Sequence, residues 1–113
     1  MIVEMRTYTF RSGTMATYLA AFERIGFALQ AKHLGACIGF YTSETGPIEQ
    51  VVQIFGYADW QERDTRRKAL YADDAFKEMS RDLHPLIQSK STQLFRSVDT
   101  GCARDAAKDG QIS

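Results

Sequence analysis

The sequence predicts a single α+β domain in which an antiparallel sheet carries its helices on one face. Three observations lead to this fold class. Four stretches have the alternation or composition of strands, longer stretches between them have the apolar spacing of helices, and turn residues separate them. Their order is β-α-β-β-α-β, which is the ferredoxin-like arrangement. A chain of 113 residues, 44% of them hydrophobic and 25% charged, suits one globular domain.

The first strand and the first helix differ in their periods. Residues 2–10 alternate along the chain as a strand does. Thr14 then stands where an N-cap is expected, and between Met15 and His33 the apolar residues follow one helical stripe. Gly35 is expected to end this helix, because glycine readily adopts the left-handed conformation that closes many helices.

A hairpin and the start of a second helical region are predicted next. Residues 36–44 and 48–57 have the composition of strands, and the turn residues between them predict an antiparallel hairpin. Asp59, followed three residues later by Glu62, resembles a capping box. It is expected to begin a helix that runs to about Tyr71.

The second helical region is split, and one strand follows it. Asp73 is a second helix-start signal, and the helical pattern after it continues until Pro85. Residues 90–98 are the last predicted strand. Residues 100–113 have no apolar period and are expected to form a loose tail, so we place the domain at residues 1–99.

The two faces of the predicted sheet need different partners. Helices cover one face, and a chain of this length has no third layer for the other. We therefore expect a homodimer in which two sheets meet face to face. A pocket for a small organic molecule is expected either between the two sheets or between the sheet and its helices. By strand parity, a mainly aliphatic set of side chains is assigned to the helix side: Val3, Met5, Ile38, Phe40, Val52 and Ile54. Polar and aromatic side chains on the other parity are expected to line the pocket: Glu4, Arg6, Tyr8, Tyr41, Gln53 and Phe55.

The composition argues against several classes of protein. The formal net charge is +0 and no run of the chain is basic, which disfavours a surface for nucleic acid. The N-terminus lacks the charged and apolar regions of a signal peptide, and no apolar run approaches the roughly 20 residues of a membrane helix. We therefore expect a cytoplasmic protein that binds neither nucleic acid nor membranes.

Cysteine and histidine are sparse. Cys37 and Cys102 form no CxxC pair, and His33 and His84 are far apart in sequence. We therefore expect neither a metal site nor a cofactor. Cys37 lies in an apolar run and is expected to be buried.

Three segments combine into a recognisable pattern. They are EMRTY in the first strand, GFYTSETGPIEQVVQIFGYAD in the hairpin, and Arg63, Arg67, Leu70 and Asp73 in the helix that follows. Together they resemble the NIPSNAP family, and the resemblance implies a dimeric α+β barrel but no settled reaction. It also places the recurrent polar positions of the family on Glu4, Arg6, Tyr8, Glu44, Arg63 and Arg67.

The chain departs from that family at two places. Glu49 stands where the family often has Asn, and Gln53-Ile54-Phe55 stands where it often has His-Leu-Trp. A neutral amide cannot transfer the proton that an imidazole can. If relatives use that histidine as a base, Gln53 does not take that role in this chain.

Three functions fit the sequence. The first is a small-molecule-binding protein, including a cofactor-independent oxygenase or isomerase, with catalysis left open. The second is a non-catalytic protein-interaction module, and the third is a haem protein with His33 or His84 as an axial ligand. Glu4 and Arg6 fit two roles equally well: they orient a ligand, or they form an ion pair that closes the dimer.

The helix residues have ordinary structural interpretations. Arg63 and Arg67 lie four residues apart on one helix face, which favours ion pairs with Glu44 or with acids on the same helix, such as Glu62, over anion binding. Asp73 is expected to cap a helix.

Overall fold

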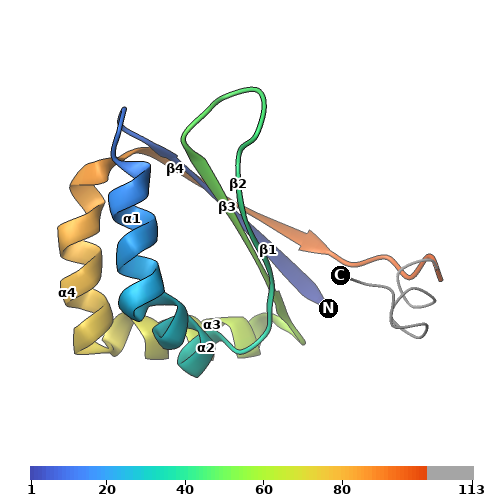
Figure 1. Ribbon diagram of the computed structural model, residues 1–113. Coiled ribbons are helices and arrows are strands. Elements are labelled where there is room, and N and C mark those ends of the chain that lie inside the picture. Colours follow the sequence, from blue (N-terminus) through green and yellow to red (C-terminus); the bar gives the residue numbers. More distant parts are fainter. Residues whose placement is uncertain (102–113) are drawn as a thin grey trace.

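The helices and strands of the computed structural model follow the predicted order (Figure 1). The structure describes residues 1–101, so nearly all of the tail predicted over 100–113 lies outside the described residues. The strands are β1 (Ile2–Phe10), β2 (Cys37–Thr42), β3 (Gln50–Tyr57) and β4 (Ile87–Arg96). The helical elements are α1 (Met15–Ala21), the π-helical turn η1 (Phe22–Gly26), α2 (Phe27–Leu34), α3 (Trp60–Ala72), α4 (Asp74–Leu83) and the 3-10 turn η2 (His84–Leu86).

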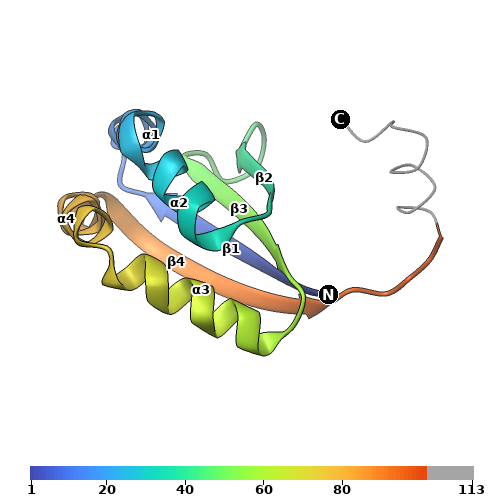
Figure 2. The same cartoon turned by 90° about the horizontal axis from the view of Figure 1, so that it is seen from below.

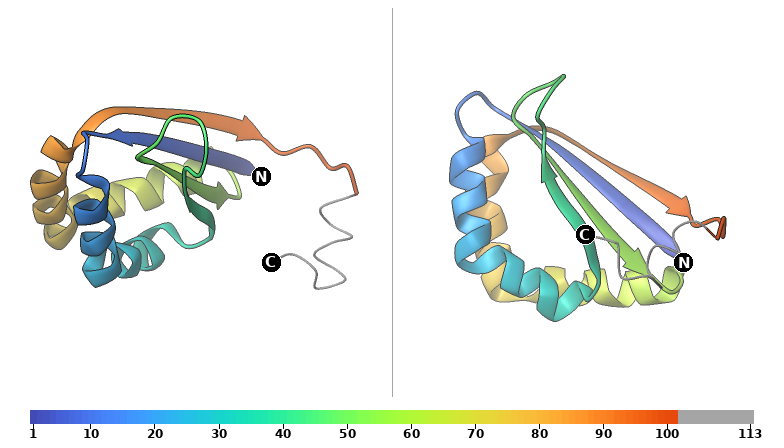
Figure 3. Two further views of the ribbon diagram at one scale, coloured as in Figure 1. Left: turned by 45° about the horizontal axis from the view of Figure 1, so that its top comes forward. Right: turned by 45° about the vertical axis from the view of Figure 1, so that its right-hand side comes forward.

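The four strands form one antiparallel sheet in the order β2-β3-β1-β4. The helices pack on one face of this sheet, as two neighbouring segments that run from α1 to α2 and from α3 to α4 (Figures 2 and 3). Within the described residues the opposite face, which we call the open face, carries no helix. The predicted α+β fold class is therefore confirmed. None of the described helices is both long and apolar enough to cross a membrane.

The ends of the helices agree with their sequence signals. Gly35 follows α2 with φ of 76°, the left-handed region that glycine adopts readily. The Asp59 carboxylate accepts a hydrogen bond of 2.8 Å from the backbone N–H of Glu62 and begins α3. The Asp73 carboxylate accepts one of 2.9 Å from the N–H of Ala75, so it separates α3 from α4 and caps the second helix as predicted.

The parity of β1 and β3 is opposite to the prediction. Glu4 pairs with Phe55 and Arg6 with Gln53, and Glu4, Gln53 and Phe55 are no more than 1% exposed. Only the helices of the same chain can bury them, so this set faces the helices. The aliphatic set assigned to the helices lies on the open face instead: Val3, Met5, Val52 and Ile54.

Strand β2 contains an irregularity that the alternation did not reveal. Its register with β3 shifts between Cys37 and Gly39. Phe40 faces the helices as predicted, with its ring centroid 4.9 Å from that of Phe27. Ile38 lies instead on the open face and is half-exposed, and Cys37 is exposed rather than buried, because the shift takes both out of the expected alternation.

The core between sheet and helices has two parts. One is aromatic and lies under α1 and α4, with Phe10, Tyr18 and Phe22 among its buried members. The other lies under α2 and α3 and includes Phe55 and Tyr57. Buried polar side chains lie among these clusters, and they form the candidate site.

Candidate functional site

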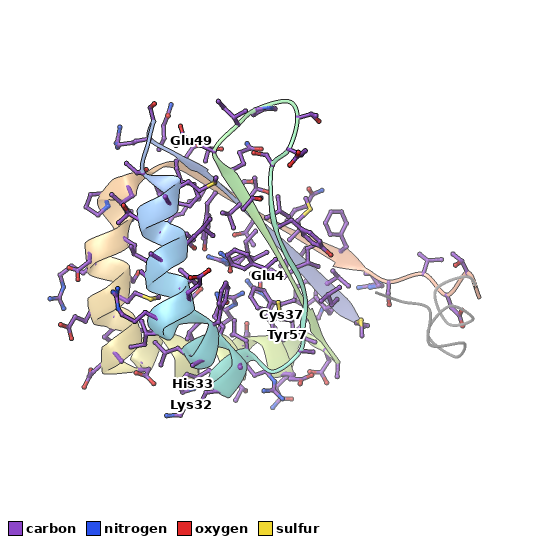
Figure 4. The ribbon with its side chains drawn as sticks, viewed as in Figure 1. Glu4, Lys32, His33, Cys37, Glu49 and Tyr57 are labelled. Carbon is purple, nitrogen blue, oxygen red and sulfur yellow. The ribbon has the colours of Figure 1, made fainter. Side chains whose placement is uncertain are left out.

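A single buried carboxylate organises one end of the core. The Glu4 side chain is fully buried, and four side chains donate hydrogen bonds to it. Oε1 accepts from the Tyr57 hydroxyl at 3.0 Å and from Arg67 Nε at 3.1 Å. Oε2 accepts from Arg63 Nη2 at 2.9 Å and from Arg6 Nη1 at 3.0 Å. Figure 4 shows Glu4 and Tyr57 close together between the strands and α3.

The ionisation of this cluster follows from its contacts. Burial alone would raise the pKa of Glu4, but the hydrogen bond from Arg63 and the charges of Arg67 and Arg6 lower it from 4.5 to about 2. Burial raises the pKa of Tyr57 to about 12, so its hydroxyl remains a neutral donor. The cluster therefore keeps one negative and three positive charges across the physiological pH range.

A second polar chain runs through the core beside the first. Gln30 Nε2 donates to Gln53 Oε1 at 2.8 Å, and Gln53 Nε2 donates to the Tyr18 hydroxyl at 2.9 Å. All three residues are buried. Burial also raises the pKa of Tyr18 well above its usual range, so this hydroxyl keeps its proton.

A cavity of about 190 Å³ lies between the two helical segments and the sheet. Its lining comes from β1, β4 and every helical segment, so it belongs to the helix side of the sheet. Polar groups on its wall include Arg6, Tyr8, Tyr18, Gln30 and Arg67. The cavity therefore joins the Glu4 cluster to the glutamine–tyrosine chain.

Arg67 is the most deeply buried cation on the wall of the cavity. It is 5% exposed, and its guanidinium carbon lies 5.1 Å from the centre of the Phe55 ring. Nη2 lies 2.9 Å from Glu4 Oε1, so it is ion-paired with this carboxylate, although its N–H groups are not aligned for a hydrogen bond to a described residue. Arg67 therefore connects the Glu4 cluster directly to the wall of the cavity.

The profile of one protein family matches residues 3–100, which is most of the chain. The chain belongs to the NIPSNAP family. Among solved structures, a NIPSNAP family protein from Agrobacterium tumefaciens is 35% identical, with a TM-score of 0.84 over 88% of this chain and 94% of that one. A putative antibiotic biosynthesis monooxygenase from Nitrosomonas europaea has a TM-score of 0.66 over 87% and 99% of the two chains. At 9% identity, this second likeness shows the fold alone.

A curated relative is much longer than this NIPSNAP chain. The Danio rerio protein NipSnap homolog 2 is 29% identical over 95 residues, which are 83% of this chain. Those residues are 32% of the zebrafish protein, so the NIPSNAP domain described here spans about a third of it.

The structure brings together most of the predicted site residues, although on the other face of the sheet. Five of the six lie on the helix side, around the cavity and the adjoining Glu4 cluster: Glu4, Arg6, Tyr8, Gln53 and Phe55. Tyr41 does not join them, because it pairs with Val52 on the open face and is 52% exposed.

The main partner of the two NIPSNAP helix arginines differs from those expected. Both Arg63 and Arg67 bind Glu4, whereas Glu62 pairs with Arg66 at 2.9 Å. An acid on the same helix contributes as well, since Asp64 lies 3.8 Å from Arg63. Glu44 is exposed in the loop between β2 and β3. The spacing of four residues placed both arginines on one helix face, and it gave no indication that a strand carboxylate lies opposite.

Sequence reasoning missed two members of the site, Tyr18 and Gln30, which occupy positions that read as ordinary helix residues. Tyr57 shares the parity of Gln53 and Phe55 but was not singled out as a site residue. The only available signal was a polar or phenolic side chain on an otherwise apolar stripe. Such side chains need buried partners, so they mark a buried network when several occur together.

The two histidines have separate environments. His33 Nε2 lies 2.8 Å from the Asp73 carboxylate, outside the cavity, and this contact is the leading cause of the lowered pKa of Asp73. His84 lines the cavity, and its imidazole has no hydrogen bond to another described residue. Within residues 1–101 no three His, Cys, Asp or Glu side chains are grouped to hold a metal ion.

Proposed function

We propose that this NIPSNAP domain binds a small organic molecule in the cavity between its sheet and its helices. One observation carries the proposal: a cavity of about 190 Å³ is walled by buried polar side chains, among them Tyr18, Gln30 and Arg67. Packed cores contain few voids, and the voids that they contain are rarely lined by several polar groups. A ligand that fills the space and forms hydrogen bonds with the wall accounts for the cavity and its polar lining.

A fragment screen by ligand-observed NMR tests this proposal. The library should contain single-ring anions, cations and neutral molecules in equal number. Ser80 is an exposed residue of α4 on the cavity lining, so Ser80→Trp is expected to fill the space and abolish binding. Lys77→Trp is the matched control, because Lys77 is exposed on the same helix and does not line the cavity. Binding that survives in Ser80→Trp, or no binding in the wild type, would overturn the proposal.

For the reaction, we propose cofactor-independent proton transfer. The His84 imidazole lines the cavity, and histidine is the commonest general base. It would take a proton from carbon while the electron pair moves onto the neighbouring oxygen of the substrate. The Tyr8 and Tyr18 hydroxyls would stabilise that oxyanion. Return of the proton at another carbon gives an isomerase, and addition of dioxygen to the carbanion gives an oxygenase.

His84→Asn tests the catalytic role separately from binding. The variant should bind the ligand found in the screen with little change and lose its turnover. Unchanged turnover would remove His84 from the mechanism and leave the binding proposal standing.

We also propose that the open face forms a homodimer. Apolar side chains on this face are exposed to a degree unusual for a monomer: Ile38 and Tyr41 are each 52% exposed and Phe95 is 41% exposed. Two copies related by a two-fold axis would bury the same patch on both. This use of the open face leaves the cavity free, because the cavity lies on the other side of the sheet.

A further inference from the structure

The charges around the cavity do not cancel. Arg6, Arg63 and Arg67 surround one carboxylate, that of Glu4. Arg63 also contacts Asp64, but this ion pair is weak because Asp64 is 64% exposed and lies 3.8 Å away. Among the described residues the lining adds one further cation, Lys90, and contains no Asp or Glu. Buried charge without a counter-charge is costly, so this site is suited to an anion.

The nitrogens of Arg67 are only partly used by the protein. Nε donates to Glu4 and to the Tyr57 hydroxyl, which fixes the plane of the guanidinium. Nη2 lies 2.9 Å from Glu4 Oε1 in the ion pair, whereas the hydrogen bonds of Arg67 to described residues come from Nε and none comes from Nη1. Nη1 is therefore free to donate to an oxygen in the cavity, and a hydrogen bond between two ionised groups is about twice as strong as a neutral one.

The phenols of the lining are also donors with a free proton. The Tyr18 oxygen already accepts from Gln53, and the Tyr8 oxygen accepts from Arg6 Nε at 2.9 Å. Neither hydroxyl donates to another described residue, so each has a proton to give. The wall thus offers hydrogen-bond donors from a guanidinium and from phenols. A ligand group that accepts hydrogen bonds and donates none is complementary to such a wall. An ionised carboxylate has this property.

The rest of the wall is apolar and sets the size of the ligand. The apolar part of the cavity lining includes Phe22, Phe76, Met79, Leu83 and the Tyr71 ring. An apolar protein cavity of about 150 Å³ is known to hold one benzene molecule. A volume of about 190 Å³ therefore accommodates one six-membered ring with a small substituent and excludes fused rings.

We propose that the ligand is a small carboxylic acid that carries a single ring, bound as its anion with the carboxylate toward Arg67 and Tyr18. This inference rests on the proposed function and gives it a substrate class. The carboxylate would supply the negative charge that the three arginines lack, and the ring would fill the aromatic side of the cavity.

Isothermal titration of the wild-type protein with matched probes tests the inference. At constant ionic strength and pH 7, benzoate should bind at least ten times more tightly than benzamide, which has the same shape without the charge. Benzylamine should not bind, because it would add a cation to the site. 2-Naphthoate keeps the charge and should bind at least ten times more weakly than benzoate, because its second ring does not fit.

One variant links the effect to charge without disturbing the core. Lys90 is an exposed residue of β4 on the cavity lining, so Lys90→Gln should weaken benzoate several-fold and leave benzamide unchanged. Lys77→Gln removes an equally exposed charge away from the cavity and should change neither.

The outcomes separate this inference from the proposed function. Benzamide or benzylamine binding as tightly as benzoate would overturn the carboxylate assignment and leave a small-molecule site in place. Equal binding of 2-naphthoate would overturn the limit of one ring. Failure of every probe to bind would overturn the carboxylic-acid assignment, and the fragment screen then decides separately whether the cavity binds any small molecule.

Discussion

Replacing Glu4 by Gln should destabilise the fold more than almost any other change of one charge. The variant keeps the shape of the side chain and leaves three guanidiniums without their shared anion. The pKa of Glu4 falls from 4.5 to about 2 on folding, and at about 1.4 kcal/mol for each unit of pKa this corresponds to about 3 kcal/mol. Removing one partner of a buried ion pair typically costs about 3–5 kcal/mol, which agrees.

The pH dependence gives this prediction a distinctive form. Because folding lowers the pKa of Glu4, its stabilisation is complete above pH 4.5 and is lost as the pH falls through about 2. Urea unfolding of wild type and Glu4→Gln should therefore differ by about 3 kcal/mol at pH 7, and the difference should shrink toward zero near pH 2. Glu23→Gln, an exposed change on η1, should show almost no difference at either pH. A Glu4→Gln variant as stable as wild type at pH 7, or a difference independent of pH, would refute the reasoning.

Three further predictions concern the core and the open face. A Cβ atom at Gly26 would lie 2.5 Å from the Phe22 ring, so Gly26→Ala should lower the free energy of unfolding in urea by about 1–3 kcal/mol. It should also alter ligand binding, because Phe22 lines the cavity. An unchanged free energy of unfolding would contradict this prediction. Gln53→Leu leaves the Tyr18 hydroxyl without its donor, so the free energy of unfolding should fall by about 1–3 kcal/mol; a neutral result would show that the polar chain adds no stability. Ile54→Lys puts a charge on the open face, so light scattering should find a dimer for wild type and a monomer for the variant; a monomeric wild type would disprove the dimer.

Local signals in the sequence were sufficient for the helices and strands. Asp59, Asp73 and Gly35 each stand at a helix boundary for a reason that involves only their own backbone and near neighbours. The start of β4 was the largest error in these bounds, because the strand begins at Ile87 directly after η2 rather than at residue 90.

The side of the sheet could not be derived from the same signals. Both faces of β1 and β3 carry apolar residues, so alternation alone does not say which face is covered by helices. The assignment sent the mainly aliphatic parity toward the helices and so left Glu4 on the opposite face, whereas the fold buries this carboxylate in the core, which is costly. In the structure that cost is offset by Arg63 and Arg67, which lie about sixty residues away in sequence and pair with Glu4 only after the chain folds. A buried acid whose partners are distant in sequence is thus the feature that parity rules assign wrongly.

A crystal structure of the protein grown with benzoate tests the central claim most directly. We predict density for one ring and its carboxylate on the helix side of the sheet, within hydrogen-bond distance of Arg67 and Tyr18, in every subunit. Crystals of the Ser80→Trp variant grown in the same way should show no such density. Benzoate seated on the open face, or a cavity that stays without ligand at saturating benzoate, would contradict the account.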